Sequence, residues 1–228
     1  MMKQVQTAEE ILSRLHALAN PVNVEGMKRY GINTHNTLGI SIYILRPIAK
    51  AIGRDHSLAQ QLWASGIHEA RILASYIDNP QQVTPEQMDR WAADFDSWDV
   101  CDQVCELFSM TPYAYQKVFE WSERSEEFVK RTAFALIAEL AAHDKKAPNE
   151  KFEQFLPLIV RESTDERNFV KKAVNWALRN IGKRNRYLNG QAIDTARQIQ
   201  QINAKAARWN ASDALRELTS EKVQARLK

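Results

Sequence analysis

A carboxylate, an arginine and two tryptophans lie off the apolar stripes of three predicted helices. Trp98 and Asp102 are one helical turn apart on a helix predicted over residues 97–108, and Arg131 and Trp176 lie on two later helices. A carboxylate can stabilise developing positive charge and can orient or deprotonate water. Aromatic faces suit a cationic or sugar-like group. If the three helices line one face, the four side chains would share one groove.

Trp98 and Asp102, the two candidate residues of the first helix, could also have a purely structural role. The apolar stripe of residues 97–108 is formed by Val100, Cys101, Val104, Leu107 and Phe108. Trp98 lies about a third of a turn from the centre of that stripe, and Asp102 lies one turn beyond Trp98. A tryptophan usually packs in a core, so Trp98 could pack on a neighbouring helix while Asp102 is solvated.

Arg131 and Trp176 leave similar alternatives open. On the helix predicted over 125–142, Arg131 projects opposite the core stripe, onto a strip formed by Ala135, Ala138 and Ala142. It could reach across a groove from there, or it could form an ion pair with Glu127, worth about 0.3–0.5 kcal/mol if exposed. On the helix predicted over 167–182, Trp176 falls among cations and serves either cation–π packing or an aromatic, basic surface for nucleic acid.

The elements that must position these residues are helices throughout. Apolar residues recur with helical spacing, and no alternating run rich in Val, Ile and Thr competes as a strand. Thr84–Pro85 and Thr111–Pro112 have the residue types of helix starts, and Asn79–Pro80 that of a helix end. Helices are predicted near 7–19, 38–52, 55–65, 67–78, 84–94, 97–109, 111–122, 125–142, 149–162, 167–182, 189–201, 203–217 and 219–227.

An internal repeat indicates how the helices are arranged. Phe128-Val129-Lys130-Arg131 aligns with Phe169-Val170-Lys171-Lys172, an offset of 41 residues, and an apolar helix lies between the two segments. Helix pairs that recur at about forty residues are typical of HEAT and armadillo repeats. The sequence therefore predicts an all-α fold, a HEAT-like helical-repeat solenoid (an α-α superhelix) with a concave groove, as a single domain over residues 1–228.

Composition excludes several classes of protein. The chain has 228 residues, 44% hydrophobic and 26% charged, which permits a sizeable core and is unlike a disordered or low-complexity chain. Its apolar runs are shorter than a membrane span, and its first residues lack the apolar core of a signal peptide, so no membrane association is expected. Cys101 and Cys105, the two cysteines, favour a reducing, cytoplasmic location over a disulfide scaffold.

The distribution of charge says more about partners than the net charge of +3. Residues 78–127 contain twelve acidic and three basic residues, a net charge of −9, whereas residues 161–210 contain eleven basic and four acidic residues, a net charge of +7. A basic C-terminal third indicates a polyanionic partner, although a solvated helical face would have the same composition.

Metal and cofactor chemistry have little support. The five histidines are scattered without metal-ligand spacing, and two cysteines are too few for a zinc site. His68, with Glu69 and Arg71, is expected to form a buried polar turn. No glycine-rich phosphate loop or nucleophile elbow is present, so we expect neither a metal nor a cofactor.

Taken together, these residues resemble the AlkD-type DNA alkylation-repair glycosylases, an all-helical family built from HEAT-like repeats. The resemblance runs through most of the chain, and its most specific part is the Trp-Asp-x-x-Asp element at 98–102 combined with the later Arg131 and Trp176. It is carried by the segments at 27–30 (Met-Lys-Arg-Tyr), 63–71, 97–102, 128–133 and 169–179.

The resemblance implies a reaction and a role for each residue. The family hydrolyses the N-glycosidic bond of alkylated, cationic purines such as 7-methylguanine and 3-methyladenine. By resemblance, Asp102 is the catalytic carboxylate, Trp98 and Trp176 cradle the deoxyribose, and Arg131 lies in the active cleft, with Asp99 as an alternative carboxylate nearer the helix flank. The DNA-binding residues are expected to be Tyr30, Lys171, Lys172, Arg179, Lys183 and Arg184.

Three functions remain open at this stage. The first is a monofunctional alkylpurine DNA glycosylase, a monomer that needs no cofactor and acts on double-stranded DNA carrying alkylated bases. The second is a non-catalytic binder of DNA structures, and the third is a protein-interaction scaffold, a common use of HEAT-like solenoids. The acidic segment at 78–127 surrounds Asp102, and acids lining the groove would oppose the approach of phosphate.

Overall fold

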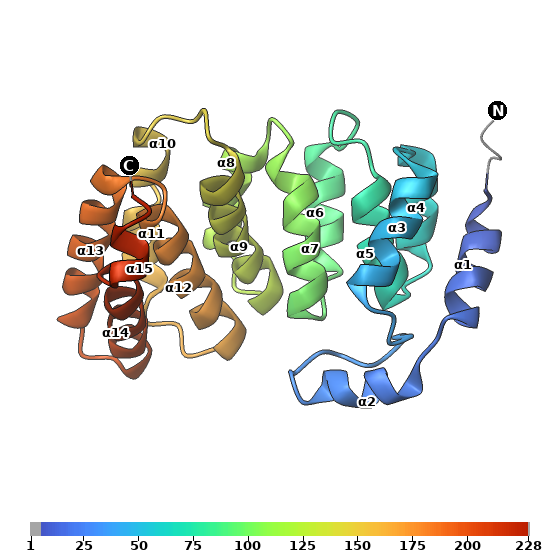
Figure 1. Ribbon diagram of the computed structural model, residues 1–228, viewed down its shortest axis with the longest axis horizontal. Helices are drawn as coiled ribbons and strands as arrows, with labels where there is room; N and C mark the ends of the chain where they lie inside the picture. Colours follow the sequence, from blue (N-terminus) through green and yellow to red (C-terminus); the bar gives the residue numbers. More distant parts are fainter. Residues whose placement is uncertain (1–5, 228) are drawn as a thin grey trace. The chain divides into compact units, whose positions relative to one another are not determined.

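The computed structural model describes residues 6–227, and all regular secondary structure in that range is helical (Figure 1). The prediction of an all-α fold is therefore confirmed. The chain forms two compact units, with the boundary between Thr111 and Pro112. Each unit has its own buried apolar residues and is held by its own hydrogen bonds.

The first unit ends at Thr111 and carries Tyr30, Trp98 and Asp102. Its helices are α1 (Ala8–Ala17), α2 (Pro21–Lys28), α3 (Ile42–Ile52), α4 (His56–Ala64), α5 (His68–Ile77), α6 (Pro85–Ala93) and α7 (Trp98–Ser109). At the centre of this unit, the indole rings of Trp63 and Trp91 stack with their centroids 3.9 Å apart. Buried aromatic surface of this kind is a large contribution to a core.

The second unit begins at Pro112 and carries Arg131 and Trp176. Its helices are α8 (Ala114–Ser122), α9 (Glu127–His143), α10 (Glu150–Glu153), α11 (Leu156–Glu162), α12 (Asn168–Gly182), α13 (Arg186–Gln200), α14 (Lys205–Leu218) and α15 (Glu221–Gln224). Helix α9 packs between α8 and α12, and most of its residues are buried. A helix that is apolar nearly all round is typical of the centre of a helical layer.

The helix starts follow from local hydrogen bonding. The Thr7 hydroxyl accepts from Glu10 N–H while the Glu10 carboxylate accepts from Thr7 N–H, a reciprocal capping box at α1. Thr84 accepts from the N–H of Gln87, and Pro85 occupies the first turn of α6, as the sequence predicts. These caps satisfy N–H groups that have no partner within the helix.

Two helical segments differ from the prediction. Helix α2 was not predicted, because none of its residues is buried and it has no apolar stripe to detect. The sequence signal for its start was Pro21 directly after the capping residue Asn20. The helix predicted over 149–162 is divided into α10 and α11, with Pro157 in the first turn of the second. Proline favours the start of a helix and disfavours its interior.

The internal repeat is confirmed by the packing of α9 against α12. The rings of Phe128 and Phe169, which the offset of 41 residues aligns, stack with centroids 5.5 Å apart. Equivalent positions of the two helices therefore meet directly, as in stacked repeats.

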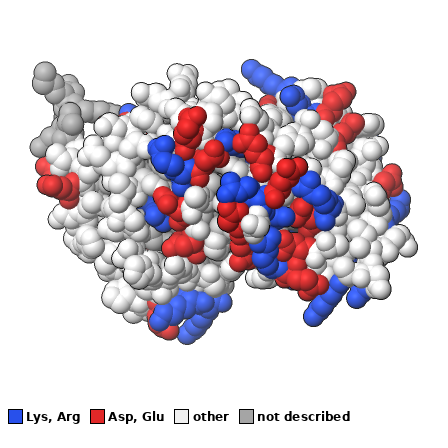
Figure 2. Space-filling model, turned by 180° about the vertical axis from the view of Figure 1, so that it is seen from behind, with Lys and Arg blue, Asp and Glu red and all other residues white. Residues whose placement is uncertain are grey.

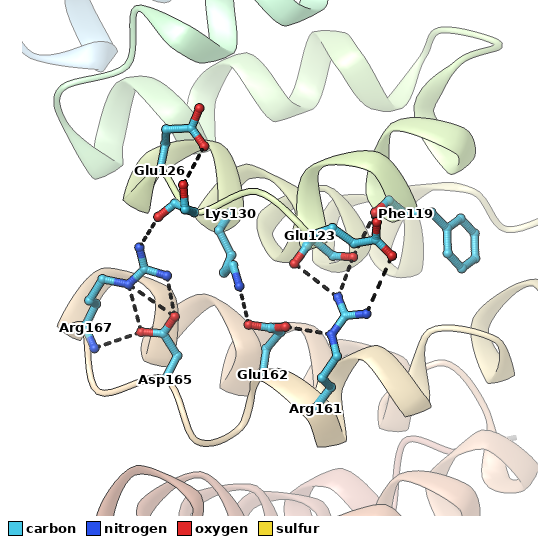
Figure 3. A network of polar contacts seen from close by, with 10 residues as sticks. Phe119, Glu123, Glu126, Lys130, Arg161, Glu162, Asp165 and Arg167 are labelled. Atoms are coloured by element: carbon cyan, nitrogen blue, oxygen red, sulfur yellow. Dashed lines mark hydrogen bonds and ion pairs between the residues drawn. The ribbon is translucent and has the colours of Figure 1, made fainter.

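An ion-pair network joins the turns that precede α9 and α12 (Figure 3). Lys130 donates to Glu162, and Arg161 Nη2 donates to the carbonyl of Ser122 at 3.1 Å. Arg167 pairs with Asp165 and donates to the carbonyl of Ser125 at 2.6 Å. These contacts fix one repeat against the next at the level of the main chain.

Candidate functional site

Helix α7 places Trp98 and Asp102 on a face away from its core. Its buried side chains are Val100, Cys101, Val104, Cys105, Leu107 and Phe108, whereas Trp98 and Asp102 are partly exposed. The helical wheel therefore separated the apolar stripe from this pair correctly. Because one turn of an α-helix covers 3.6 residues, the indole and the carboxylate lie one above the other.

The segment that follows α2 is fastened to the start of α7. The indole Nε1 of Trp98 donates to the carbonyl of Tyr30 at 3.0 Å. The Oγ of Ser97 accepts from Asn33 N–H at 2.8 Å, which is why it does not cap α7, and Asn33 Nδ2 donates to Asp96 at 2.8 Å. Tyr30 itself is exposed. The structure thus brings Tyr30 and Trp98 together, and Ser97 and Asn33 are positioning residues that the sequence analysis missed.

Asp99, the alternative carboxylate, is engaged by His68. Its Oδ2 lies 2.9 Å from Nε2 of the buried His68, and its Oδ1 is buried without a hydrogen-bond partner. Burial alone would lower the pKa of His68, but the hydrogen bond and the charge of Asp99 outweigh it and raise this pKa above its ordinary value. The Asp99 carboxylate is therefore part of a structural pair with His68.

Glu69 holds the loop between α2 and α3. Its buried carboxylate accepts from the main-chain N–H groups of Leu38, Gly39 and Ile40 at 2.8, 2.6 and 3.1 Å. The expectation of a buried polar turn at His68 and Glu69 is confirmed, whereas Arg71 is separate and lies over the ring of Trp63 at 5.3 Å. A carboxylate that accepts three N–H groups is strongly fixed, so Glu69 anchors this loop to α5.

Arg131 does not project onto an open strip, and that expectation is wrong. Its side chain is 5% exposed, and Ala135 and Ala138 beside it are fully buried. Its Nη1 donates to the carbonyl of Phe169 at 2.7 Å. The reason is the packing of α12 on the face of α9 that the wheel left unoccupied. The guanidinium is consequently held in one orientation by the neighbouring repeat.

Trp176 is partly exposed on α12, among buried residues that include Asn175 and Ala177. Asn175 donates to the carbonyl of Asn210 at 3.1 Å, which fixes α12 against α14. In the described part of the chain no Lys or Arg lies over the Trp176 ring; Lys171 instead lies over Trp209, at 5.1 Å from the ring centroid. The cation–π interpretation of Trp176 is therefore not supported.

The basic residues of α12 are partly neutralised by α14. Arg179 pairs with Glu217 and with Asp213, and Lys183 pairs with Glu217 at 2.9 Å. Partial burial alone would raise the pKa of Glu217, but its hydrogen bonds to Lys183 and Arg179 lower it overall. The charge count over 161–210 missed these acids because both lie just beyond the counted range.

Arg184 also serves the fold. It donates to the carbonyls of Ala141 and Ala147, both at 3.0 Å, and it lies over the ring of Phe152 at 4.0 Å. Burial lowers the pKa of this guanidinium. Among the predicted DNA contacts, Lys172 on α12 and Lys183 just after it are exposed, and Lys183 pairs with Glu217. Figure 2 likewise shows basic and acidic side chains side by side on the face in view, rather than in separate patches.

The candidate residues therefore belong to two groups, one in each compact unit. The first unit holds Tyr30, Trp98 and Asp102, and the second holds Arg131 and Trp176 with the basic residues of α12. The sharing of one groove by all of them stays a prediction. Within residues 6–227, no three His, Cys, Asp or Glu side chains gather as metal ligands, and no helix is long and apolar enough to cross a membrane.

Comparisons with known proteins extend over the whole fold. The model of the family described as DNA alkylation repair enzyme matches residues 11–218. A solved structure described as "a new family of proteins related to the HEAT-like repeat DNA glycosylases with affinity for branched DNA structures" is 20% identical, with a TM-score of 0.82 over 97% of this chain and 96% of that one. This likeness confirms the HEAT-like repeat fold.

Other comparisons add little. A designed armadillo repeat protein is 19% identical over 77% of this chain and 92% of its own, with a TM-score of 0.36. No curated protein matches the sequence.

Proposed function

Because the chain belongs to the DNA alkylation repair enzyme family, we propose that it is a DNA glycosylase for alkylated, cationic purines such as 7-methylguanine and 3-methyladenine. The observation that carries the proposal is the pair on α7: Trp98 is fixed by the carbonyl of Tyr30, and Asp102 lies one turn further on, partly exposed. The ligand is double-stranded DNA, and one copy of the chain is sufficient.

The chemistry needs one well-placed anion. Alkylation gives the base a positive charge, so it leaves without an acid catalyst, and the sugar becomes oxocarbenium-like. The Asp102 carboxylate stabilises that charge and aligns the attacking water. One preorganised electrostatic contact of this kind is worth about 10²–10³ in rate. The proposed set contains no lysine to form a Schiff base, so hydrolysis without strand cleavage is expected.

The residues of the second unit have supporting roles in this proposal. Arg131 is buried and its guanidinium is oriented by the carbonyl of Phe169; in this proposal its positive charge attracts a DNA phosphate and does not act on the cationic sugar. Trp176 offers an indole face to the deoxyribose, and the exposed Lys172 contacts a phosphate. The pairing of Arg179, Lys183 and Arg184 within the fold leaves them smaller roles in binding.

A second candidate is a binder of branched DNA that does not excise bases. The observation that favours it is the structural relative of TM-score 0.82, which is described as having affinity for branched DNA structures. The neutralised cations of α12 do not distinguish the two functions, because both require contacts with phosphate.

Release of 7-methylguanine from methylated duplex DNA tests the proposal. Wild-type protein should release the base, and Asp102→Asn should lose release by at least about 10²-fold while its affinity for the duplex is kept. Asp194→Asn removes an exposed carboxylate of the second unit and is the matched control, with release unchanged. No release by the wild type, together with tight binding of a four-way junction, would instead support the second candidate. If the protein neither releases the base nor binds the junction, a protein-interaction scaffold is supported.

A further inference from the structure

A basic pocket lies in the first unit, beside helix α3. Its volume is about 340 Å³, and its charged lining residues are Arg46, Lys50, Arg54 and Glu106. Arg46 and Lys50 lie one turn apart on one face of α3, and Arg54, after the turn that ends the helix, extends this row because all three line the pocket. Neither the charge analysis of the sequence nor the proposed glycosylase site uses this row.

The position of Arg54 is built by the main chain. Gly53 ends α3 with a φ of 81°, a conformation that residues with side chains rarely adopt, and the chain turns there. Arg54 Nη1 then donates to the carbonyls of Tyr76 and Asp78, at 3.1 and 2.5 Å, at the end of α5. The guanidinium is thereby held at the end of the row without a carboxylate.

Tyr76 orders the other end of the row. The guanidinium carbon of Arg46 lies 5.9 Å from the centroid of the Tyr76 ring, and the Tyr76 hydroxyl donates to Gln103. A hydrogen bond to Tyr76 is the main cause that raises the pKa of Arg46. Tyr76 therefore contacts two of the three cations, Arg46 through its ring and Arg54 through its carbonyl.

The row is only partly neutralised within the described chain, because the charge of Glu106 acts on Arg46 and contributes to the rise of its pKa. No carboxylate of residues 6–227 forms an ion pair with Arg46, Lys50 or Arg54, and Glu106 is the single acid that lines the pocket. Arg46 and Lys50 are like charges at four-residue spacing on α3, so they repel each other weakly, and a bound anion would relieve that repulsion. The four charges sum to +2, which matches a phosphate group, and the arginine fork suits phosphate oxygens.

We propose that this pocket is a phosphate-binding site formed by Arg46, Lys50 and Arg54. The phosphate belongs either to a DNA backbone or to a free phosphate ester. The first source rests on the proposed function, because it adds a backbone contact to the DNA interface; the second source does not.

The site is tested with inorganic phosphate and with DNA in parallel. Phosphate is titrated into wild-type protein and into Lys50→Gln at constant ionic strength, with amide chemical shifts of α3 as the readout. Lys50 is exposed, so this variant should fold. Its affinity for phosphate should fall roughly two- to fivefold, and Glu106→Gln, which removes the acid of the pocket, should bind phosphate more tightly. Lys145→Gln changes the net charge equally at an exposed loop of the second unit and should leave phosphate affinity unchanged.

The DNA measurement distinguishes the two sources. If the phosphate belongs to DNA, Lys50→Gln should lower the slope of log K against log salt for a duplex by about 1 relative to Lys145→Gln. Weaker phosphate binding with an unchanged slope assigns the site to a free phosphate ester. The proposal is overturned if wild-type protein shows no phosphate-dependent shifts in α3, or if Lys50→Gln and Lys145→Gln behave alike in both measurements. The phosphate titration needs neither DNA nor excision, so a failure of the glycosylase proposal would leave it unaffected.

Discussion

The indole nitrogen of Trp98 donates a hydrogen bond of 3.0 Å to the main-chain carbonyl of Tyr30, 68 residues earlier in the chain. Helix α2 has no buried side chain. This bond joins the segment that follows α2 to the first residue of α7. The same tryptophan is one turn from Asp102. The orientation of the indole, and hence the surface offered beside the carboxylate, thus depends on the segment that carries Tyr30.

Trp98→Phe is expected to loosen this segment while keeping an aromatic ring on α7. The variant should lose about 0.5–1.5 kcal/mol of the free energy of unfolding, the usual net value of one hydrogen bond. Amide hydrogens of residues 30–33 should exchange faster, because a fastening of the segment is lost. Trp176→Phe keeps the Tyr30 contact and is the matched control. Unchanged exchange at residues 30–33 in Trp98→Phe would contradict the fastening role.

The pair of His68 and Asp99 predicts a pH dependence of stability. The pKa of His68 is raised in the folded protein, so the protonated imidazole is favoured there. Its contribution is fully present below the unfolded pKa, about 6.5, and is lost as the pH rises through the folded pKa. Urea unfolding at a series of pH values should therefore show wild-type stability falling more steeply above about pH 6.5 than that of Asp99→Asn. Parallel curves would show that the pair does not titrate in this way.

Glu69→Gln should be strongly destabilising. The carboxylate accepts three main-chain N–H groups in a buried site, and an amide offers one oxygen and brings an NH₂ group that the site cannot accept. A loss of about 3 kcal/mol is expected, measured by chemical denaturation. Glu9→Gln, at an exposed position of α1, is the control and should change stability by less than about 0.5 kcal/mol.

Gly39→Ala probes the same loop without touching the carboxylate. Gly39 has a φ of 75°, and an added Cβ would lie 2.3 Å from the carbonyl oxygen of Asn20. Both the conformation and the space oppose a side chain, so a loss of at least about 1 kcal/mol is expected. Gly190→Ala adds a methyl group in open space on α13 and should be neutral or stabilising.

The parts of the fold that were predictable share one property: their apolar residues repeat along the chain. The stripe of α7 predicted which residues are buried there, and the offset of 41 residues predicted the contact of Phe128 with Phe169. Helix α2 has no such stripe, since it is held by main-chain and polar contacts at its ends rather than by a buried face. Periodicity detects burial, so it cannot detect an element of this kind.

The site was predictable one helix at a time but not between helices. A helical wheel shows that Arg131 lies off the core stripe, but it does not show that α12 covers that face. A count of charges shows the cations Arg179 and Lys183, but it does not show that Glu217, on α14, forms ion pairs with both of them. Both errors concern contacts between segments 34 to 38 residues apart, for which one sequence contains no direct signal.

Arg184 and Lys172 should separate structural from DNA-binding cations on the second unit. Arg184→Gln removes a guanidinium that donates to the carbonyls of Ala141 and Ala147 and packs on Phe152. It should lower the free energy of unfolding by about 1.5–3 kcal/mol, because hydrogen bonds from a charged donor to two carbonyls are lost. Lys172→Gln should change stability by less than about 0.5 kcal/mol, since its side chain is exposed, but should lower the salt slope of duplex binding by about 1. Denaturation and salt-dependent anisotropy are measured on the same two proteins. A reversed pattern, in which Arg184→Gln keeps its stability but has a lower salt slope while Lys172→Gln has an unchanged slope, would place the DNA-binding charge on Arg184.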